Sequence, residues 1–109
     1  RLEAILSSVL PLDPACHTES SVWLAFAGLA ARDRAVGDRF RAMYLEWESS
    51  VANELRSLGL GDDAVAVAGV LTAATDGIAL RALASAMAPT HQLELLREAI
   101  DRCVQTAVN

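Results

Sequence analysis

The sequence predicts an all-α fold, a five-helix bundle that forms one domain over residues 1–109. Hydrophobic residues make up 53% of the chain and aromatic residues only 5%, which favours helices packed through Leu, Val and Ala over a β-sandwich. Apolar residues recur at helical spacing, and the breaks between these stretches are short, as in a helical bundle. No pair of segments resembles a strand hairpin.

Charge and composition limit the possible partners. The net charge is −5, and all nine basic residues are arginine. An acidic domain without a basic run is a poor nucleic-acid binder by itself, because phosphate contacts supply most of that affinity. No apolar run approaches the roughly 18 residues of a membrane span, and no signal peptide is visible. The exclusive use of arginine, with abundant alanine, is typical of a high-GC bacterial source. We therefore expect a cytoplasmic bacterial protein with two free thiols and no membrane partner.

The first helix is predicted over residues 1–10, where Leu2, Ile5, Leu6 and Val9 form one stripe and Pro11 ends the helix. The chain begins inside this helix without a methionine. We therefore expect a fragment whose first helix is the end of a longer one.

Two aspartates are predicted to start the next two helices. Asp13 can cap a helix with Pro14 at its first position, over residues 14–31. Asp33 can cap the third helix, over 34–58, and Gly59 suits the left-handed residue after its end. The third helix carries one apolar stripe, consisting of Val36, Phe40, Met43, Tyr44, Trp47, Val51, Leu55 and Leu58.

The helix predicted over residues 63–87, capped by Asp62 or Asp63, has two apolar stripes on nearly opposite sides. One holds Val67, Val70, Leu71, Ala74 and Ile78; the other holds Val65, Leu80, Leu83 and Met87. Two stripes indicate a helix covered on both faces. It is either a core helix of an alanine-rich protein or a helix that also forms a dimer. The last helix, over 91–107 with Thr90 as its cap, has one apolar side.

Catalysis is poorly supported. The chain has no glycine-rich phosphate loop and no distinctive carboxylate pair. A zinc site or a Cys–His nucleophile from Cys16, His17, His91 and Cys103 would require distant helix ends to converge, and the spacing matches no zinc pattern. We predict no enzyme activity, no cofactor and no metal.

The aromatic residues are more informative, because all of them belong to the second and third helices. They form either a solid core or an apolar pocket with polar handles. Glu54 and Asp76 lie on apolar faces, and each is either an acid at the edge of its stripe or a group aimed into a ligand cavity, toward a cation against the rings. The predicted ligand-binding residues are Trp23, Phe26, Phe40, Met43, Tyr44, Trp47, Glu54 and Asp76.

The order of these features resembles the C-terminal regulatory domain of TetR-family transcriptional regulators, in the BetI-like subgroup. The resemblance covers nearly the whole chain. Its motifs are Leu10-Pro11-Leu12-Asp13, Val22-Trp23-Leu24-Ala25-Phe26, the helix with Tyr44, Glu46 and Trp47, and Ala74-Thr75-Asp76-Gly77-Ile78-Ala79-Leu80. Ile78 stands where the family usually has leucine.

The resemblance implies a homodimer in which the last two helices of each protomer, here 63–87 and 91–107, form an intermolecular four-helix bundle. The residues assigned to this interface are Val67, Leu71, Ala74, Ile78, Leu96, Ile100, Cys103 and Val104. It also implies a small-molecule effector in the aromatic pocket and DNA contact through an N-terminal helix-turn-helix domain. That motif is missing from this sequence.

Two functions therefore remain open. The chain is predicted to be the ligand-sensing and dimerisation domain of a transcriptional repressor, whose ligand changes the DNA affinity of the missing domain. The alternative is a purely structural dimerisation module with a solid core and no ligand.

Overall fold

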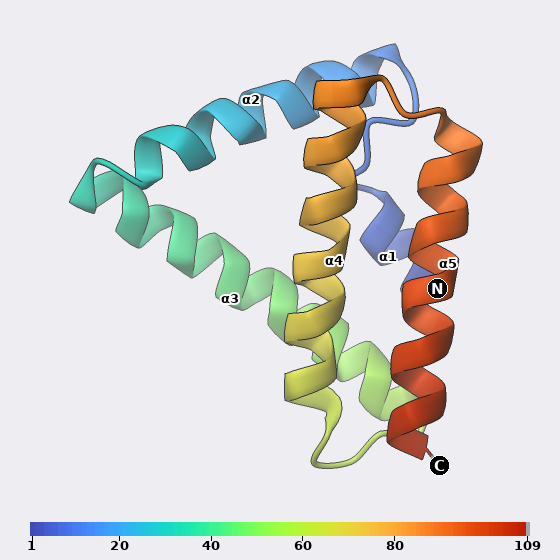
Figure 1. Ribbon diagram of the computed structural model, residues 1–109. Helices are drawn as coiled ribbons and strands as arrows, with labels where there is room; N and C mark the ends of the chain where they lie inside the picture. Colours follow the sequence, from blue (N-terminus) through green and yellow to red (C-terminus); the bar gives the residue numbers. More distant parts are fainter. Residues whose placement is uncertain (109) are drawn as a thin grey trace.

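The computed structural model describes residues 1–108 and confirms the all-α fold (Figure 1). Its elements are α1 (Leu2–Ser7), α2 (Pro14–Ala30), α3 (Arg34–Ser57), α4 (Ala64–Ser85) and α5 (Pro89–Val108).

The predicted signals for the starts of α2 and α3 and for the end of α3 are confirmed. The Asp13 side chain accepts a hydrogen bond from the backbone N–H of Cys16 at 2.8 Å, and Asp33 accepts one from Val36 at 3.1 Å. Gly59, just beyond α3, has φ +99°, a conformation that costs glycine little because it has no Cβ. These local contacts set where the chain turns.

Three predicted helix ends are wrong by a few residues. α1 ends at Ser7 instead of residue 10. α4 ends at Ser85 because Ala86 adopts the left-handed conformation, with φ 53° and ψ 45°. α5 begins at Pro89, whose fixed φ suits the first turn of a helix, so Thr90 lies inside the helix and is not its cap. At the start of α4, Asp63 is the N-cap residue but its side chain makes no capping hydrogen bond.

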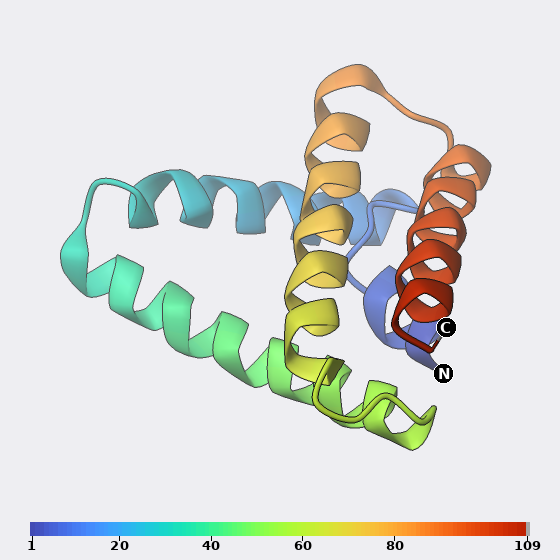
Figure 2. The ribbon, with the colours of Figure 1, turned by 60° about the horizontal axis from the view of Figure 1, so that its bottom comes forward.

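α2 and α3 form a hairpin that extends away from the pair α4 and α5 (Figures 1 and 2). At the tip of this hairpin, a Cβ added to Gly37 would lie 3.1 Å from the carbonyl oxygen of Ala30, so a side chain there would crowd the turn. α4 packs against each of the other four helices, which makes it the central element of the fold.

The core lies where α1, the second half of α3, α4 and α5 meet. Its fully buried leucines come from all four of these helices or their ends, and they are Leu6, Leu10, Leu55, Leu71 and Leu96. The Gln92 side chain is also buried and donates hydrogen bonds to the backbone oxygens of Met87, at 2.9 Å, and Pro11, at 3.4 Å. This amide ties the turn after α4 to the turn before α2.

Only one side of α4 is buried within the protomer, and its buried residues are Ala64, Ala68, Leu71, Thr72, Thr75, Ile78, Ala79 and Ala82. The opposite side is open, with Val65, Val70 and Leu80 exposed by 63%, 55% and 45%. The two predicted stripes do not coincide with these two sides, because Val70 was grouped with Leu71 but lies on the exposed side with Val65 and Leu80.

This arrangement corrects part of the predicted interface. Leu71 and Leu96 have no exposed surface, and Ile78 is only 8% exposed. They face the protomer's own core, because α4 lies between α3 and α5 and buries this side against them. Val67, Ala74, Ile100, Cys103 and Val104 are half-buried.

By length and composition alone α4 could cross a membrane, with a mean hydropathy of 1.4. A core helix of a folded domain passes the same test, and α4 packs against the other four helices. We therefore treat α4 as the central helix of the bundle.

The burial predicts a sharp contrast between two leucines of α3. Leu55→Ala should lower the free energy of unfolding by about 2–5 kcal/mol, because Leu55 is fully buried and its removal leaves a cavity. Leu45→Ala is the matched control, since Leu45 is 58% exposed, and it should change stability by less than about 0.5 kcal/mol. Urea denaturation of both variants tests this, and equal losses would contradict the assigned core.

Candidate functional site

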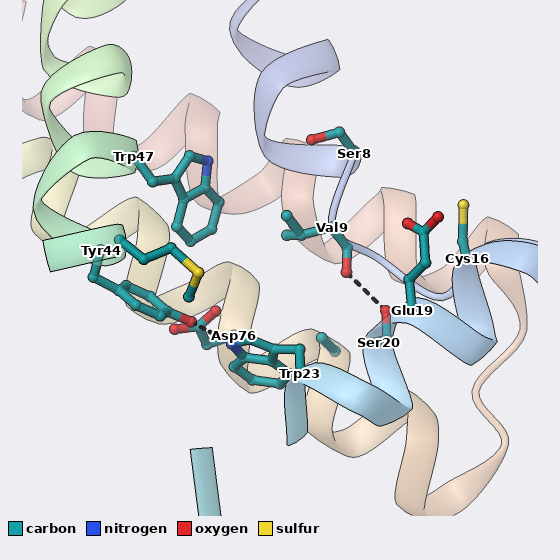
Figure 3. Close-up of a pocket in the computed structure, with 11 residues that line it drawn as sticks. Ser8, Val9, Cys16, Glu19, Ser20, Trp23, Tyr44, Trp47 and Asp76 are labelled. Atoms are coloured by element: carbon teal, nitrogen blue, oxygen red, sulfur yellow. Dashed lines mark hydrogen bonds between the residues drawn. The ribbon is translucent and has the colours of Figure 1, made fainter. Parts of the chain in front are cut away.

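One cavity of about 210 Å³ lies between the end of α1 and the helices α2, α3 and α4 (Figure 3). Its walls are mostly apolar, with a few polar groups. The lining residues are Ser8, Val9, Cys16, Glu19, Ser20, Trp23, Met43, Tyr44, Trp47, Asp76 and Ala79. An apolar cavity with a few convergent polar groups is typical of small-molecule sites.

Three of these side chains, one from each of three helices, bring their polar groups together. The indole Nε1 of Trp23, on α2, donates to the hydroxyl oxygen of Tyr44, on α3, at 2.9 Å. The Asp76 carboxyl, on α4, lies beside the Tyr44 hydroxyl, and each group shifts the pKa of the other. Figure 3 shows the three groups converging at one side of the cavity. We call Trp23, Tyr44 and Asp76 the polar triad.

Both acids of the polar triad have shifted pKa values. Burial raises the pKa of Asp76 from 3.8 to about 6; the hydrogen bond from Tyr44 opposes this rise, and the nearby charge of Glu48 adds to it. Burial, followed by the hydrogen bond to Asp76, raises the pKa of Tyr44 well above its ordinary value. At pH 7 the Tyr44 hydroxyl is therefore neutral and the Asp76 carboxyl is largely ionised.

The ionised Asp76 has no cationic partner among the side chains that the structure describes. No Arg or His side chain lines the cavity, whereas Glu19 does. Thr72 donates a hydrogen bond to Glu48 at 3.4 Å beside the same stretch of α4. The cavity is thus an apolar space with negative charge at its polar side.

Five of the eight predicted ligand-binding residues line the cavity: Trp23, Met43, Tyr44, Trp47 and Asp76. Phe26 and Phe40 do not line it. Their rings lie 5.5 Å apart, and Phe40 stacks on Tyr44 with centroids 4.7 Å apart. These two rings therefore support Tyr44 from the side of the hairpin tip.

Glu54, the remaining predicted ligand-binding residue, does not line this cavity. Its carboxylate pairs with the guanidinium of Arg1, Nε to Oε2, at 3.1 Å. Glu54 lies nearly two turns beyond Trp47 along α3, where that helix packs against α1. At this position Glu54 fits the other predicted reading, an acid at the edge of an apolar stripe, and its charge is paired with Arg1.

Sequence reasoning missed six residues of the cavity: Ser8, Val9, Cys16, Glu19, Ser20 and Ala79. Four residues of α2 follow helical spacing, because Cys16, Glu19, Ser20 and Trp23 lie at i, i+3, i+4 and i+7 and share one face. Only the aromatic member of that face was recognised. The polar members looked like ordinary surface residues.

Residues 1–105 match the family of BetI-type transcriptional repressor C-terminal domains. The chain belongs to this family. No curated protein and no solved structure matches the chain significantly. Membership makes the chain a regulatory domain of a transcriptional regulator, a class of DNA-binding dimers with small-molecule effectors.

The BetI-type domain shows no group of three His, Cys, Asp or Glu side chains placed to hold a metal ion within the part of the chain that the structure describes. Cys16 and Cys103 are both free thiols.

The raised pKa of Asp76 predicts how stability depends on pH. Because the folded state binds this proton more tightly than the unfolded state, stability is lost as pH rises from about 4 to about 6. Asp76→Asn abolishes this loss. The difference in the free energy of unfolding, variant minus wild type, should therefore be about 1 kcal/mol larger at pH 7 than at pH 4. This value is reduced for solvent screening, because the Asp76 side chain is half-exposed.

Urea denaturation of both proteins at the two pH values measures this difference. Asp62→Asn is the control, because Asp62 is exposed in the turn before α4. A gain for Asp76→Asn that is the same at both pH values would show that Asp76 titrates normally.

Proposed function

We propose that this BetI-type domain senses a small-molecule effector in the cavity and dimerises through the outer side of α4 and α5. Effector binding would change the DNA affinity of a helix-turn-helix domain outside residues 1–109. The observation that carries this proposal is the cavity itself, whose walls join the end of α1 to the central helix α4.

The position of α1 supports a route from effector to DNA-binding domain. Ser8 and Val9, just beyond α1, line the cavity, and the Ser20 hydroxyl donates to the backbone oxygen of Val9 at 3.0 Å. The other wall includes Asp76 and Ala79 of α4. A ligand that contacts both walls would favour one arrangement of α1 relative to α4. The ligand relieves repression only if its affinity is higher for the arrangement that cannot bind DNA than for the arrangement that can.

The outer side of α4 and α5 supports dimerisation. Val65, Val70 and Leu80 are exposed large apolar residues on α4. A shallow groove between α4 and α5 is lined by Ala66, Val67, Val70, Cys103 and Ala107, with Asp63, Arg102 and Thr106 beside them. Exposed apolar patches with polar edges mark protein interfaces, and dimers are the rule for this class of regulator.

The cavity predicts binding of a neutral apolar probe. N-Phenyl-1-naphthylamine should bind in the cavity and gain fluorescence. Val9→Trp should weaken its binding about tenfold or more, because the indole would fill the cavity. A tenfold loss of affinity corresponds to about 1.4 kcal/mol. Val22→Trp is the matched control, since Val22 is 66% exposed on α2, and should leave binding unchanged. Absence of probe binding would favour the structural module with a solid core.

The interface predicts a dimer that one charge disrupts. Light scattering should give twice the chain mass of 11.6 kDa for the wild type. Val70→Glu should yield monomers, because a partner would bury the new carboxylate without a counterion. Val22→Glu, the same change on an exposed site of α2, should remain dimeric. A folded wild-type monomer, or a Val70→Glu dimer, would contradict this interface.

A further inference from the structure

The charge of the ligand can be inferred from the charged groups at the cavity, because Asp76 of the polar triad has no counterion there. Among the described residues, no basic side chain forms an ion pair with Asp76 or lines the cavity. A half-buried carboxylate without a counterion is costly unless something compensates it. A cationic group on the ligand would remove that cost, whereas an anionic ligand would add to it.

The Tyr44 hydroxyl is already engaged by its neighbours. It accepts a hydrogen bond from Trp23 Nε1 at 2.9 Å, and the Asp76 carboxyl lies beside it. A carboxylate offers about four lone-pair positions, so Asp76 keeps free acceptor capacity whatever it accepts from Tyr44. This side of the cavity therefore offers a ligand free hydrogen-bond acceptors, and a ligand that binds there should supply the N–H donors.

The remaining walls set the shape of the ligand. Trp23, Met43 and Trp47 present apolar surface around the polar triad, and the faces of aromatic rings attract cations and stack on apolar groups. The volume of about 210 Å³ suits a compact molecule with one polar end. Glu19, exposed on α2, lies at the other edge of the cavity.

We propose that the effector is a primary amine with an apolar body, whose ammonium N–H groups donate to Asp76 while the body lies against Trp23, Met43 and Trp47. This inference rests on the proposed function, since it assigns the ligand class of the same cavity. Charge-assisted N–H donation is about twice as strong as a neutral hydrogen bond. A quaternary ammonium ion carries the charge but has no N–H to donate.

Amine binding should depend on pH through Asp76. Its pKa is raised to about 6 by burial, whereas an alkyl ammonium group stays protonated near neutrality. The other titratable groups that face this site are Tyr44 and Glu48 from α3, and Glu19 and Cys16 from α2. Burial keeps the Tyr44 hydroxyl neutral. Affinity should therefore rise with pH up to about 7 and then level off.

Three matched probes test the proposal by calorimetry: phenethylamine, its N,N,N-trimethyl derivative and 2-phenylethanol. They share one apolar body and differ in charge and in N–H donors. We expect phenethylamine to bind about tenfold or more tightly than either analogue near neutral pH, and to lose this advantage near pH 5. Equal affinities, or tighter binding of the trimethyl derivative, would overturn the proposal.

Variants assign the effect to Asp76. Asp76→Asn should remove the preference for phenethylamine and its pH dependence, with far-UV circular dichroism confirming the fold. Asp62→Asn, an equal charge change at an exposed site, should keep both. A preference that survives in Asp76→Asn would overturn the proposal.

The neutral fluorophore separates this proposal from the proposed function. One outcome is that N-phenyl-1-naphthylamine binds and Val9→Trp blocks it, but phenethylamine binds no more tightly than its two analogues. The cavity is then an effector site for ligands of another chemical class. If neither the fluorophore nor any of the three probes binds, both proposals fail.

Discussion

The polar triad is the interaction on which the polar side of the cavity depends. Trp23, Tyr44 and Asp76 come from α2, α3 and α4, and each polar group lies in a largely apolar setting where an unmade hydrogen bond is costly. The bond from Trp23 to Tyr44 and the contact between Tyr44 and Asp76 therefore link the three helices around the cavity. The Phe40 ring, stacked on Tyr44 with centroids 4.7 Å apart, supports the central member of the triad.

α4 combines three environments around one helix. One side is buried in the protomer, the opposite side carries exposed apolar residues such as Val65 and Val70, and Asp76 lies at the boundary next to the cavity. Because α4 belongs to the core, the proposed dimer surface and the proposed effector site, a ligand and a partner protomer would both contact the same helix. The Gln92 amide, which links the turns at Met87 and Pro11, adds a rigid connection between the end of α4 and the start of α2.

Local chemistry made most of the fold predictable. Asp13, Asp33 and Gly59 act through contacts within a few residues of themselves, so sequence alone reveals them. Partner choice is different, because periodicity shows that a face is apolar but not what covers it. The pattern of α4 therefore could not separate Leu71, in the core, from Val70, on the surface. For the same reason the sequence could not show that Glu54 pairs with Arg1, 53 positions away along the chain. Nor could it show that Cys16 and Glu19 line the cavity.

The most direct test of this account is a carbon-13 NMR titration of the Asp76 side-chain carboxyl, assigned by comparison with Asp76→Asn. The Asp76 carboxyl lies beside an apolar cavity and the Tyr44 hydroxyl, and it forms no ion pair among the described residues, so its pKa should be about 6. A pKa near the ordinary 3.8 of an aspartate would mean that the carboxyl is solvated or paired with a cation. The polar triad would then not form the polar side of a ligand cavity.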